Sequence, residues 1–168
     1  GEGKIMIRFN NDYNRSAHPA VLEALMKSSG ESYGGYGLDF WCEKAAEEIG
    51  KYIGTEEADI HFLVGGTQAN FTVITAALRS YQSVISADTG HIQGHETGAV
   101  ENTGHKIIAL PSADGKITAA QVREQAELYL GSGIKEHITQ PKMVYLSFPT
   151  EFGTVYSKAE LEEISGVC

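Results

Sequence analysis

Residues 59–70 read Asp59-Ile60-His61-Phe62-Leu63-Val64-Gly65-Gly66-Thr67-Gln68-Ala69-Asn70. The short apolar run over residues 59–64 predicts a β-strand, and the glycine pair directly after it predicts a sharp turn. Residues 70–81 then predict a helix. A strand, a glycine turn and a helix in this order are typical of α/β proteins.

Short β-rich runs and longer helical patterns alternate along the rest of the chain. Residues 83–87, 106–110 and 142–148 predict further strands, and residues 118–130 predict a helix between the last two. Successive strands joined by a helix form parallel pairs. We therefore expect an α/β fold with a mostly parallel sheet and flanking helices.

Further helices are predicted on either side of these units. One has Ser16 as its N-cap, Pro19 in its first turn and its end near Gly30, and the next runs from Asp39 to Gly54. These boundaries follow from capping residues and from glycines that tolerate the left-handed conformation.

The last helix begins at a capping-box pattern made by Ser157 and Glu160. The sequence reaches Cys168 soon after, with no further strand. We therefore expect an incomplete domain. The alternative is a short C-terminal helix that docks on the sheet.

The overall composition limits the classes of partner. The 168 residues, 42% of them hydrophobic, suffice for one substantial core, and the formal net charge of -9 repels phosphate polymers and anionic lipids. No run approaches the roughly 20 apolar residues of a spanning helix. Cys42 and Cys168 lack the spacing of a disulfide framework or a metal site. We therefore expect a cytoplasmic protein that binds neither nucleic acid nor membranes.

The glycine turn is the first candidate binding site. Gly65 and Gly66 let the backbone approach a ligand closely, Thr67 offers a hydroxyl, and the start of a helix offers free N–H donors to an anion. A phosphate group fits these properties. A plain turn capped by Thr67, with nothing bound, fits the same residues.

A polar segment after the predicted strand at 83–87 is the second candidate. Ligands of open α/β sheets bind at the carboxyl ends of strands, so His91, His95 and Glu96 are expected near the same cleft as the glycine turn. The two histidines have the spacing of a helical zinc pair, but Gly94 disfavours a helix there, and we predict no metal. Solvated loop histidines are the plain alternative.

Taken together, these segments resemble the threonine aldolase and β-eliminating lyase family of pyridoxal-phosphate enzymes. The family pattern appears, in order, as Phe9-Asn10-Asn11-Asp12, His18-Pro19, Tyr36-Gly37-Leu38-Asp39, Gly65-Gly66-Thr67-Gln68-Ala69-Asn70, Gly90-His91-Ile92, Glu96-Thr97-Gly98-Ala99, Pro149-Thr150-Glu151 and Gly153-Thr154-Val155-Tyr156-Ser157. The resemblance implies the large domain of a fold-type-I enzyme. On this basis residues 39–168 are expected to form an incomplete cofactor-binding domain, preceded by an N-terminal segment and substrate-side loop at 1–38.

The resemblance also implies roles for the residues of both candidate sites. Gly66, Thr67 and Gln68 would hold the phosphate of pyridoxal 5'-phosphate. His91 would stack on the pyridine ring and transfer a proton at the substrate's β-hydroxyl, for which an imidazole is suited near neutral pH.

Other implied roles concern the substrate and the support of the site. Asn11 would contact the substrate carboxylate, and Tyr36 would lie in the substrate pocket near a subunit boundary. Glu96 would anchor either the loop or its histidine. Thr150 and Glu151 would support the site, although many family members carry an Asn-Thr-His element where this sequence has Pro-Thr-Glu.

The implied reaction is the aldol cleavage of threonine or a similar β-hydroxy-α-amino acid into glycine and an aldehyde. It requires a Schiff-base lysine, a carboxylate on the pyridine nitrogen and an arginine for the substrate carboxylate. In the family all three follow the region that this sequence covers. We therefore expect the 168-residue chain alone to be inactive.

Other functions stay open at this point. The full-length protein could be another fold-type-I enzyme, such as an aminotransferase or an ammonia-releasing β-eliminating lyase. The chain could instead be a non-catalytic module that binds a phosphate ester, or one of two polypeptides that complete a site together. The resemblance implies a small amino-acid substrate and a homodimer or homotetramer.

Overall fold

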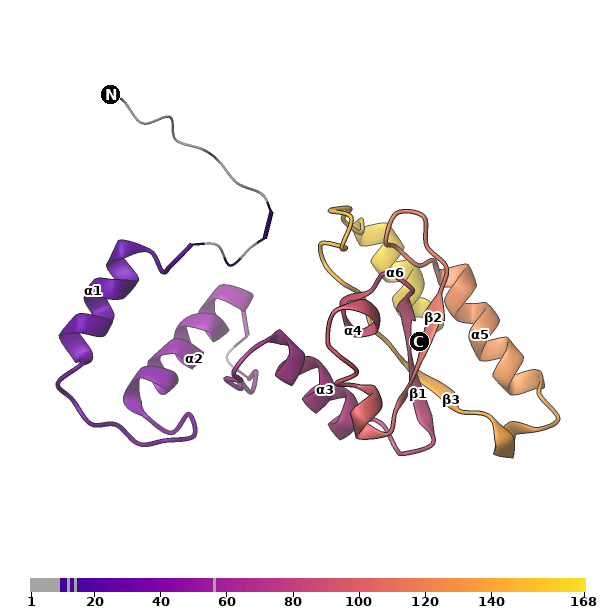
Figure 1. The fold of residues 1–168 in the computed structure, drawn as a ribbon, viewed down its shortest axis with the longest axis horizontal. Coiled ribbons are helices and arrows are strands. Elements are labelled where there is room, and N and C mark those ends of the chain that lie inside the picture. The colour runs from indigo at the N-terminus through magenta and orange to yellow at the C-terminus, as the bar shows by residue number, and fades with distance from the viewer. Residues whose placement is uncertain (1–9, 12, 14, 56) are drawn as a thin grey trace, which may run out of the picture. The chain divides into compact units, whose positions relative to one another are not determined.

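The structure is a computed structural model that describes residues 10, 11, 13, 15–55 and 57–168 (Figure 1). The chain divides into two compact units, Gly1–Phe62 and Leu63–Cys168. Residues 39–62, which the sequence analysis groups with the cofactor domain, belong to the first of these units. Among the described residues, no helix is long and apolar enough to cross a membrane.

The first unit contains the helices α1 (Pro19–Ser28) and α2 (Phe40–Ile53). The predicted N-cap of α1 at Ser16 is wrong, because the N-cap is His18, two residues later, and its φ of -56° and ψ of 143° are not helical. A residue before proline avoids the helical region, so the helix starts at Pro19.

The boundaries of α2 are confirmed. The side chain of Asp39 accepts hydrogen bonds from the N–H groups of Trp41, at 2.9 Å, and Cys42, at 3.0 Å. Gly54 closes the helix with a φ of 76°, in the left-handed region that favours glycine. Both ends are therefore set by local residues.

The predicted strand over residues 59–64 is wrong, because no strand forms there. The sheet of the described residues is made only by β1 (Gln82–Ala87), β2 (Lys106–Leu110) and β3 (Gln140–Val144). A strand requires a neighbouring strand to accept and donate its backbone hydrogen bonds. The run at 59–64 has no such neighbour among the described residues, and the N–H of Val64 instead donates to Oε1 of Gln68 at 2.7 Å.

The sheet is parallel throughout, in the order β2-β1-β3, which confirms the expected fold class. The predicted strand at 106–110 matches β2, and that at 83–87 matches β1 to within one residue. The predicted strand at 142–148 starts earlier, at Gln140, and ends at Val144. The N–H of Tyr145 still donates to the Ile85 carbonyl, at 2.8 Å, but the chain beyond it turns toward the end of β1.

Helix α3 (Gly66–Ala77) begins earlier and ends earlier than the predicted helix at 70–81. Gly65, with extended backbone, is its N-cap, so the glycine turn itself forms the first turn of the helix. The helix ends before Tyr81 because Leu78 is extended and the Gln82 side chain accepts a hydrogen bond from the N–H of Arg79 at 2.9 Å.

Two further helices are confirmed by their capping boxes. Thr118 and Gln121 cap α5 (Ala119–Gly131), and Ser157 and Glu160 cap α6 (Lys158–Val167). Short helical turns complete the unit, namely α4 (His91–Gly94), η1 (Glu101–Thr103) and η2 (Lys135–His137).

The core consists of one cluster on each face of the sheet. Alternate residues of β1 point to opposite faces. Val84 packs with residues of α3 and α4 in the first cluster, which comprises Ile74, Leu78, Val84, Ile92 and Val100. Ile85 packs with residues of α5 in the second cluster, which comprises Ile85, Ala87, Leu110, Ile117 and Val122. Helix α6 adds Val167 to the second cluster, so this helix docks on the α5 side of the sheet.

An ion pair holds the start of α6. Nζ of Lys116 lies 2.6 Å from Oε1 of Glu160, and the hydrogen bond from Lys116 lowers the pKa of Glu160 from 4.5 to about 2. A carboxyl group whose pKa is lowered by folding stabilises the protein above its ordinary pKa, and this contribution is lost as the pH falls toward the lowered value.

Glu160→Gln should therefore make the free energy of unfolding less dependent on pH in the acidic range. Glutamine still completes a capping box, but it has no charge to lose. We expect the free energy of unfolding of the wild type to fall more steeply than that of Glu160→Gln between pH 4.5 and about 2, measured by urea denaturation. Glu163→Gln, on the same helix, should keep the wild-type slope. Equal slopes for wild type and Glu160→Gln would contradict the ion pair.

Candidate active site

The segment after β1 is held in place by backbone contacts. The N–H of Asp88 donates to the Leu110 carbonyl at 2.8 Å, and that of Gly90 donates to the Ala87 carbonyl at 2.9 Å. A Cβ at Gly90 would collide with Oγ of Ser86, so only glycine fits at this position. The one-turn helix α4 then starts at His91 and is anchored by Ile92, which is buried in the first core cluster.

His91 is bound on one side and open on the other. Its Nδ1 lies 2.8 Å from Oε1 of Glu96, and its backbone N–H donates to Oγ of Ser147 at 3.2 Å. The side chain of His91 is 43% exposed, whereas that of Glu96 is fully buried. An ionised carboxylate can only accept, so it selects the ring form with hydrogen on Nδ1. Nε2 is then the ring nitrogen that can take up a proton.

Glu96 also joins this segment to α3. Nδ2 of Asn70 donates to the same Oε1 atom at 2.5 Å, while Oε2 of Glu96 is buried with no hydrogen-bond partner among the described residues. The structure thus brings His91 and Glu96 together and connects them to the helix that begins at the glycine turn. His95 is exposed, with its ring centre 5.7 Å from that of His91.

The start of α3 has free backbone N–H groups and no side-chain cap. Gly65 makes no side-chain cap, and Thr67 does not cap the helix as the plain-turn alternative expected. The first intrahelical bond runs from the N–H of Ala69 to the Gly65 carbonyl at 3.0 Å, which leaves the N–H groups of Gly66, Thr67 and Gln68 without acceptors among the described residues. A Cβ at Gly65 or Gly66 would meet nothing within 4 Å. Free N–H groups and the positive end of the helix dipole favour an anion here.

Two predicted site residues lie in the first unit. Oδ1 of Asn11 accepts a hydrogen bond from the N–H of Tyr13 at 3.2 Å. Tyr36 is fully exposed and has a φ of 64°, an uncommon value for a residue other than glycine. Their roles in substrate binding stay predictions.

Thr150 supports a turn, and Glu151 is exposed. Oγ1 of Thr150 donates to the Asp114 carbonyl at 3.3 Å and shares a hydrogen bond of 2.6 Å with Oγ1 of Thr154. Gly115, with a φ of 87°, packs directly against Thr150. Thr150 therefore holds the chain between β2 and α5.

Asn70, Tyr145 and Ser147 were not assigned roles from the sequence. Burial raises the pKa of Tyr145, while hydrogen bonds with the side chains of Ser147 and Asn70 act in the opposite direction. Asn70 belongs to the GGTQAN motif, and this was the sequence feature that could have indicated a role for it in the site. Tyr145 and Ser147 carried no comparable signal beyond their position at a predicted strand end.

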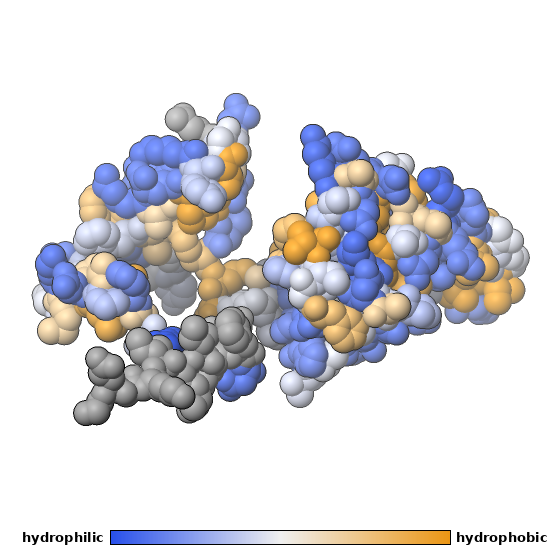
Figure 2. Space-filling view, turned by 90° about the horizontal axis from the view of Figure 1, so that it is seen from above, coloured by the Kyte–Doolittle hydropathy of each residue, from blue (hydrophilic) through white to orange (hydrophobic). Residues whose placement is uncertain are grey.

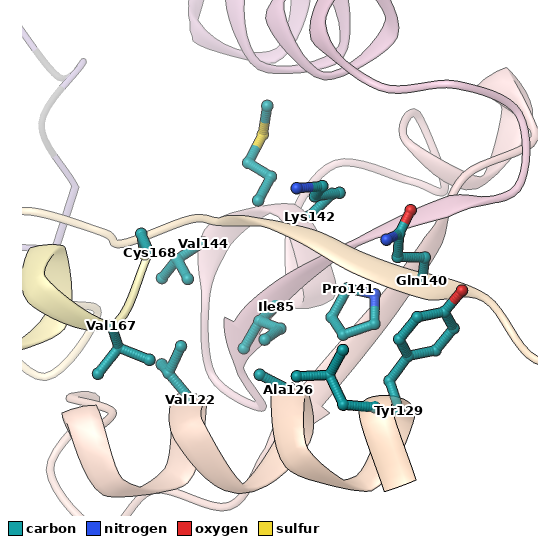
Figure 3. A pocket seen from close by; sticks show the side chains of 12 residues that line it. Ile85, Val122, Ala126, Tyr129, Gln140, Pro141, Lys142, Val144, Val167 and Cys168 are labelled. Carbon is teal, nitrogen blue, oxygen red and sulfur yellow. The ribbon is translucent and has the colours of Figure 1, made fainter. Parts of the chain in front are cut away.

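The described residues contain no group of three histidine, cysteine or acidic side chains placed to hold a metal ion. A separate cavity of about 290 Å³ lies between α5, β3 and the end of α6 (Figure 3). Its walls include Val122, Tyr129, Pro141, Val144 and Cys168. Val122 and Val144 belong to the second core cluster, so this cavity lies on the opposite face of the sheet from α3 and α4.

Comparisons with known proteins agree on one family. The family model described as beta-eliminating lyase matches residues 17–168. Low specificity L-threonine aldolases from Pseudomonas sp. (strain NCIMB 10558) and Pseudomonas aeruginosa are 32% and 31% identical, each over 96% of this chain. A threonine aldolase structure from Leishmania major matches 94% of this chain with a TM-score of 0.88 and 43% identity. The chain spans about half the length of these relatives, 46% of each curated protein and 45% of the solved chain.

Gly115→Ala tests the support that Thr150 gives to the turn. A Cβ at this position would lie 2.7 Å from Cβ of Thr150, and alanine resists a φ of 87°. We expect the free energy of unfolding to fall by about 1–3 kcal/mol, measured by urea denaturation. Gly133→Ala, where a Cβ meets nothing within 4 Å, should change it by less than about 1 kcal/mol. A loss no larger than that of the control would contradict the tight packing.

Proposed function

Because the chain belongs to the beta-eliminating lyase family, we propose that the protein is a pyridoxal-phosphate-dependent lyase that cleaves threonine or a similar β-hydroxy-α-amino acid. The products are glycine and an aldehyde. The observation that carries the proposal is the half-exposed His91 held by the buried Glu96 and connected through Asn70 to an open helix start. The curated relatives are described as L-threonine aldolases, which supports threonine as the substrate.

The residues at the start of α3 fit the phosphate group of pyridoxal 5'-phosphate. Free N–H groups at Gly66, Thr67 and Gln68 supply donors, and the absence of side chains at Gly65 and Gly66 leaves room for an anion. His91 supplies a flat, half-exposed ring that can stack on the cofactor. When bound, the cofactor accepts the electron pair that bond cleavage leaves on the substrate's α-carbon.

His91 then acts as the base for the β-hydroxyl group of the substrate. Because Glu96 holds the hydrogen on Nδ1, Nε2 can take the hydroxyl proton that must leave as the aldehyde carbonyl forms. The buried carboxylate stabilises the positive imidazolium produced by this transfer. Solvent can remove the proton afterwards because the ring is half-exposed.

Substrate binding is assigned to the first unit. We propose that Asn11 contacts the substrate carboxylate and that Tyr36 lines the substrate pocket. Tyr36 is free to contact a ligand because its side chain makes no hydrogen bond among the described residues and is fully exposed. Glu96 serves as the anchor of His91, and Thr150 and Glu151 support the chain around the site.

The proposed assembly is a homodimer or homotetramer in the cytoplasm. Large apolar side chains are exposed on both units, as Figure 2 shows, and in the first unit they include Leu25, Met26, Leu38, Phe40 and Trp41. Such surfaces favour association of subunits. Both cysteines are free thiols, which fits a reducing compartment.

His91→Asn tests the proposed reaction in the full-length protein with pyridoxal phosphate. Asparagine cannot take up the hydroxyl proton, so we expect kcat for threonine cleavage to fall by about 10²–10⁴-fold, measured by aldehyde release. His95→Asn should stay within a few fold of the wild type because the His95 side chain is exposed and makes no hydrogen bond to Glu96 among the described residues.

Wild-type turnover separates the candidate functions. Cleavage of threonine supports the aldolase, whereas release of ammonia from tyrosine, tryptophan or cysteine without cleavage of threonine would support a β-eliminating lyase, the activity that the family description names. A His91→Asn variant with wild-type kcat would rule out His91 as the base.

Reduction with borohydride tests the location of the lysine that attaches the cofactor. Borohydride fixes pyridoxal phosphate to that lysine, and peptide mass mapping identifies it. We expect no label within residues 1–168 and no cleavage of threonine by this chain alone, because the family places its lysine after the region matched here. A labelled lysine within these residues would contradict this prediction.

A further inference from the structure

The carboxylate of Glu96 depends on few partners. Its side chain is fully buried, and Oε1 receives both of its hydrogen bonds, one from Nδ2 of Asn70 at 2.5 Å and one from Nδ1 of His91 at 2.8 Å. Oε2 has no partner among the described residues. A buried polar group with few hydrogen-bond partners is costly, so each remaining donor has a large effect on the position of the Glu96 side chain.

The Asn70 side chain donates to Glu96 and lies near other polar side chains. Its amide could present either oxygen or nitrogen to Glu96, but an amide oxygen would repel a carboxylate oxygen. The half-buried Tyr145 lies near both Asn70 and Ser147, whose side chains act to lower its pKa. Ser147 in turn accepts the hydrogen bond from the backbone N–H of His91, so polar side chains surround this part of the site.

The hydrogen bond from Asn70 to Glu96 links the segment that carries His91 to the start of α3. The free N–H groups of the anion site lie in the first turn of α3, and Asn70 follows Thr67 by three residues, about 4.5 Å along the helix axis. The same rigid element therefore carries the anion site and the side chain that holds Glu96.

We propose that Asn70 is a positioning residue that holds the Glu96 carboxylate against Nδ1 of His91 and so keeps Nε2 free to act as the base. This assignment deepens the proposed function and rests on it for the role of His91 in catalysis. Asn70 itself touches neither the reacting hydroxyl nor the anion in this scheme. Its loss lets Glu96 turn toward other donors, and His91 then populates the ring form with hydrogen on Nε2.

The ring form of His91 can be measured without cofactor or turnover. In the full chain labelled with ¹⁵N-histidine, nitrogen chemical shifts distinguish hydrogen on Nδ1 from hydrogen on Nε2, and the His91→Asn spectrum assigns the signal. We expect neutral His91 to carry hydrogen mainly on Nδ1 in the wild type and to lose that preference in Asn70→Ala. Asn102→Ala, an exposed asparagine whose side chain makes no contact among the described residues, should leave the spectrum unchanged.

Kinetics in the full-length protein with pyridoxal phosphate separate positioning from a structural role. We expect Asn70→Ala to lower kcat by about 10- to 100-fold, the size of effect seen when a group that orients a metal-ligating histidine is lost, with little change in KM. If Asn70 acts through Glu96, adding Asn70→Ala to Glu96→Gln should cause no further loss of kcat. Independent, multiplicative losses would overturn the proposal.

Circular dichroism and the midpoint of urea-induced unfolding check that each variant is folded. If Asn70→Ala does not fold, Asn70→Leu, which keeps the size but removes the donor, must show the same change in ring form. An unchanged ring form in a folded variant would overturn the proposal. A changed ring form in a protein that does not cleave β-hydroxy amino acids would leave Asn70 as the positioning residue and would reject the proposed function instead.

Discussion

The paired and buried strand β1 is the constraint on which the second unit depends. It hydrogen-bonds to β2 on one side and β3 on the other, and every residue from Gln82 to Ala87 is buried. Its alternating side chains enter both core clusters, so it cannot shift along its axis without moving Val84 or Ile85 out of a packed site. The carboxyl end of β1 is thereby fixed, and the segment that carries His91 starts from that fixed point.

In the candidate site, a segment that starts at the fixed end of β1 carries the buried carboxyl group of Glu96. The side chain of Glu96 is fully buried and has two hydrogen-bond donors among the described residues, a weak set for a carboxylate removed from water. Proteins keep such groups where they perform a function, because an apolar residue would be more stable there. The cost of burial is offset locally by Asn70 and His91, and these are the residues to which the function is assigned.

Features set by neighbouring residues could be predicted from the sequence, whereas features set by distant contacts could not. The caps at Asp39, Thr118 and Ser157 act within three residues, and the helices they begin were predicted correctly. The strand at 59–64 failed because pairing depends on a neighbour that local pattern does not specify. The contact between Asn70 and Glu96 spans 26 residues, so it could not be predicted even though both residues lie in quoted motifs.

The arrangement of α3 restricts how this region of the chain can change in length. Residues on a helix are separated by about 100° of rotation, so a single residue inserted between Gln68 and Asn70 would turn the Asn70 amide away from Glu96 while leaving the free N–H groups of Gly66, Thr67 and Gln68 in place. Deleting one residue there would turn the Asn70 amide away from Glu96 by about 100° in the other direction. With the role proposed for Asn70, the spacing of the residues in this turn is therefore a stricter requirement than the identity of its exposed side chains.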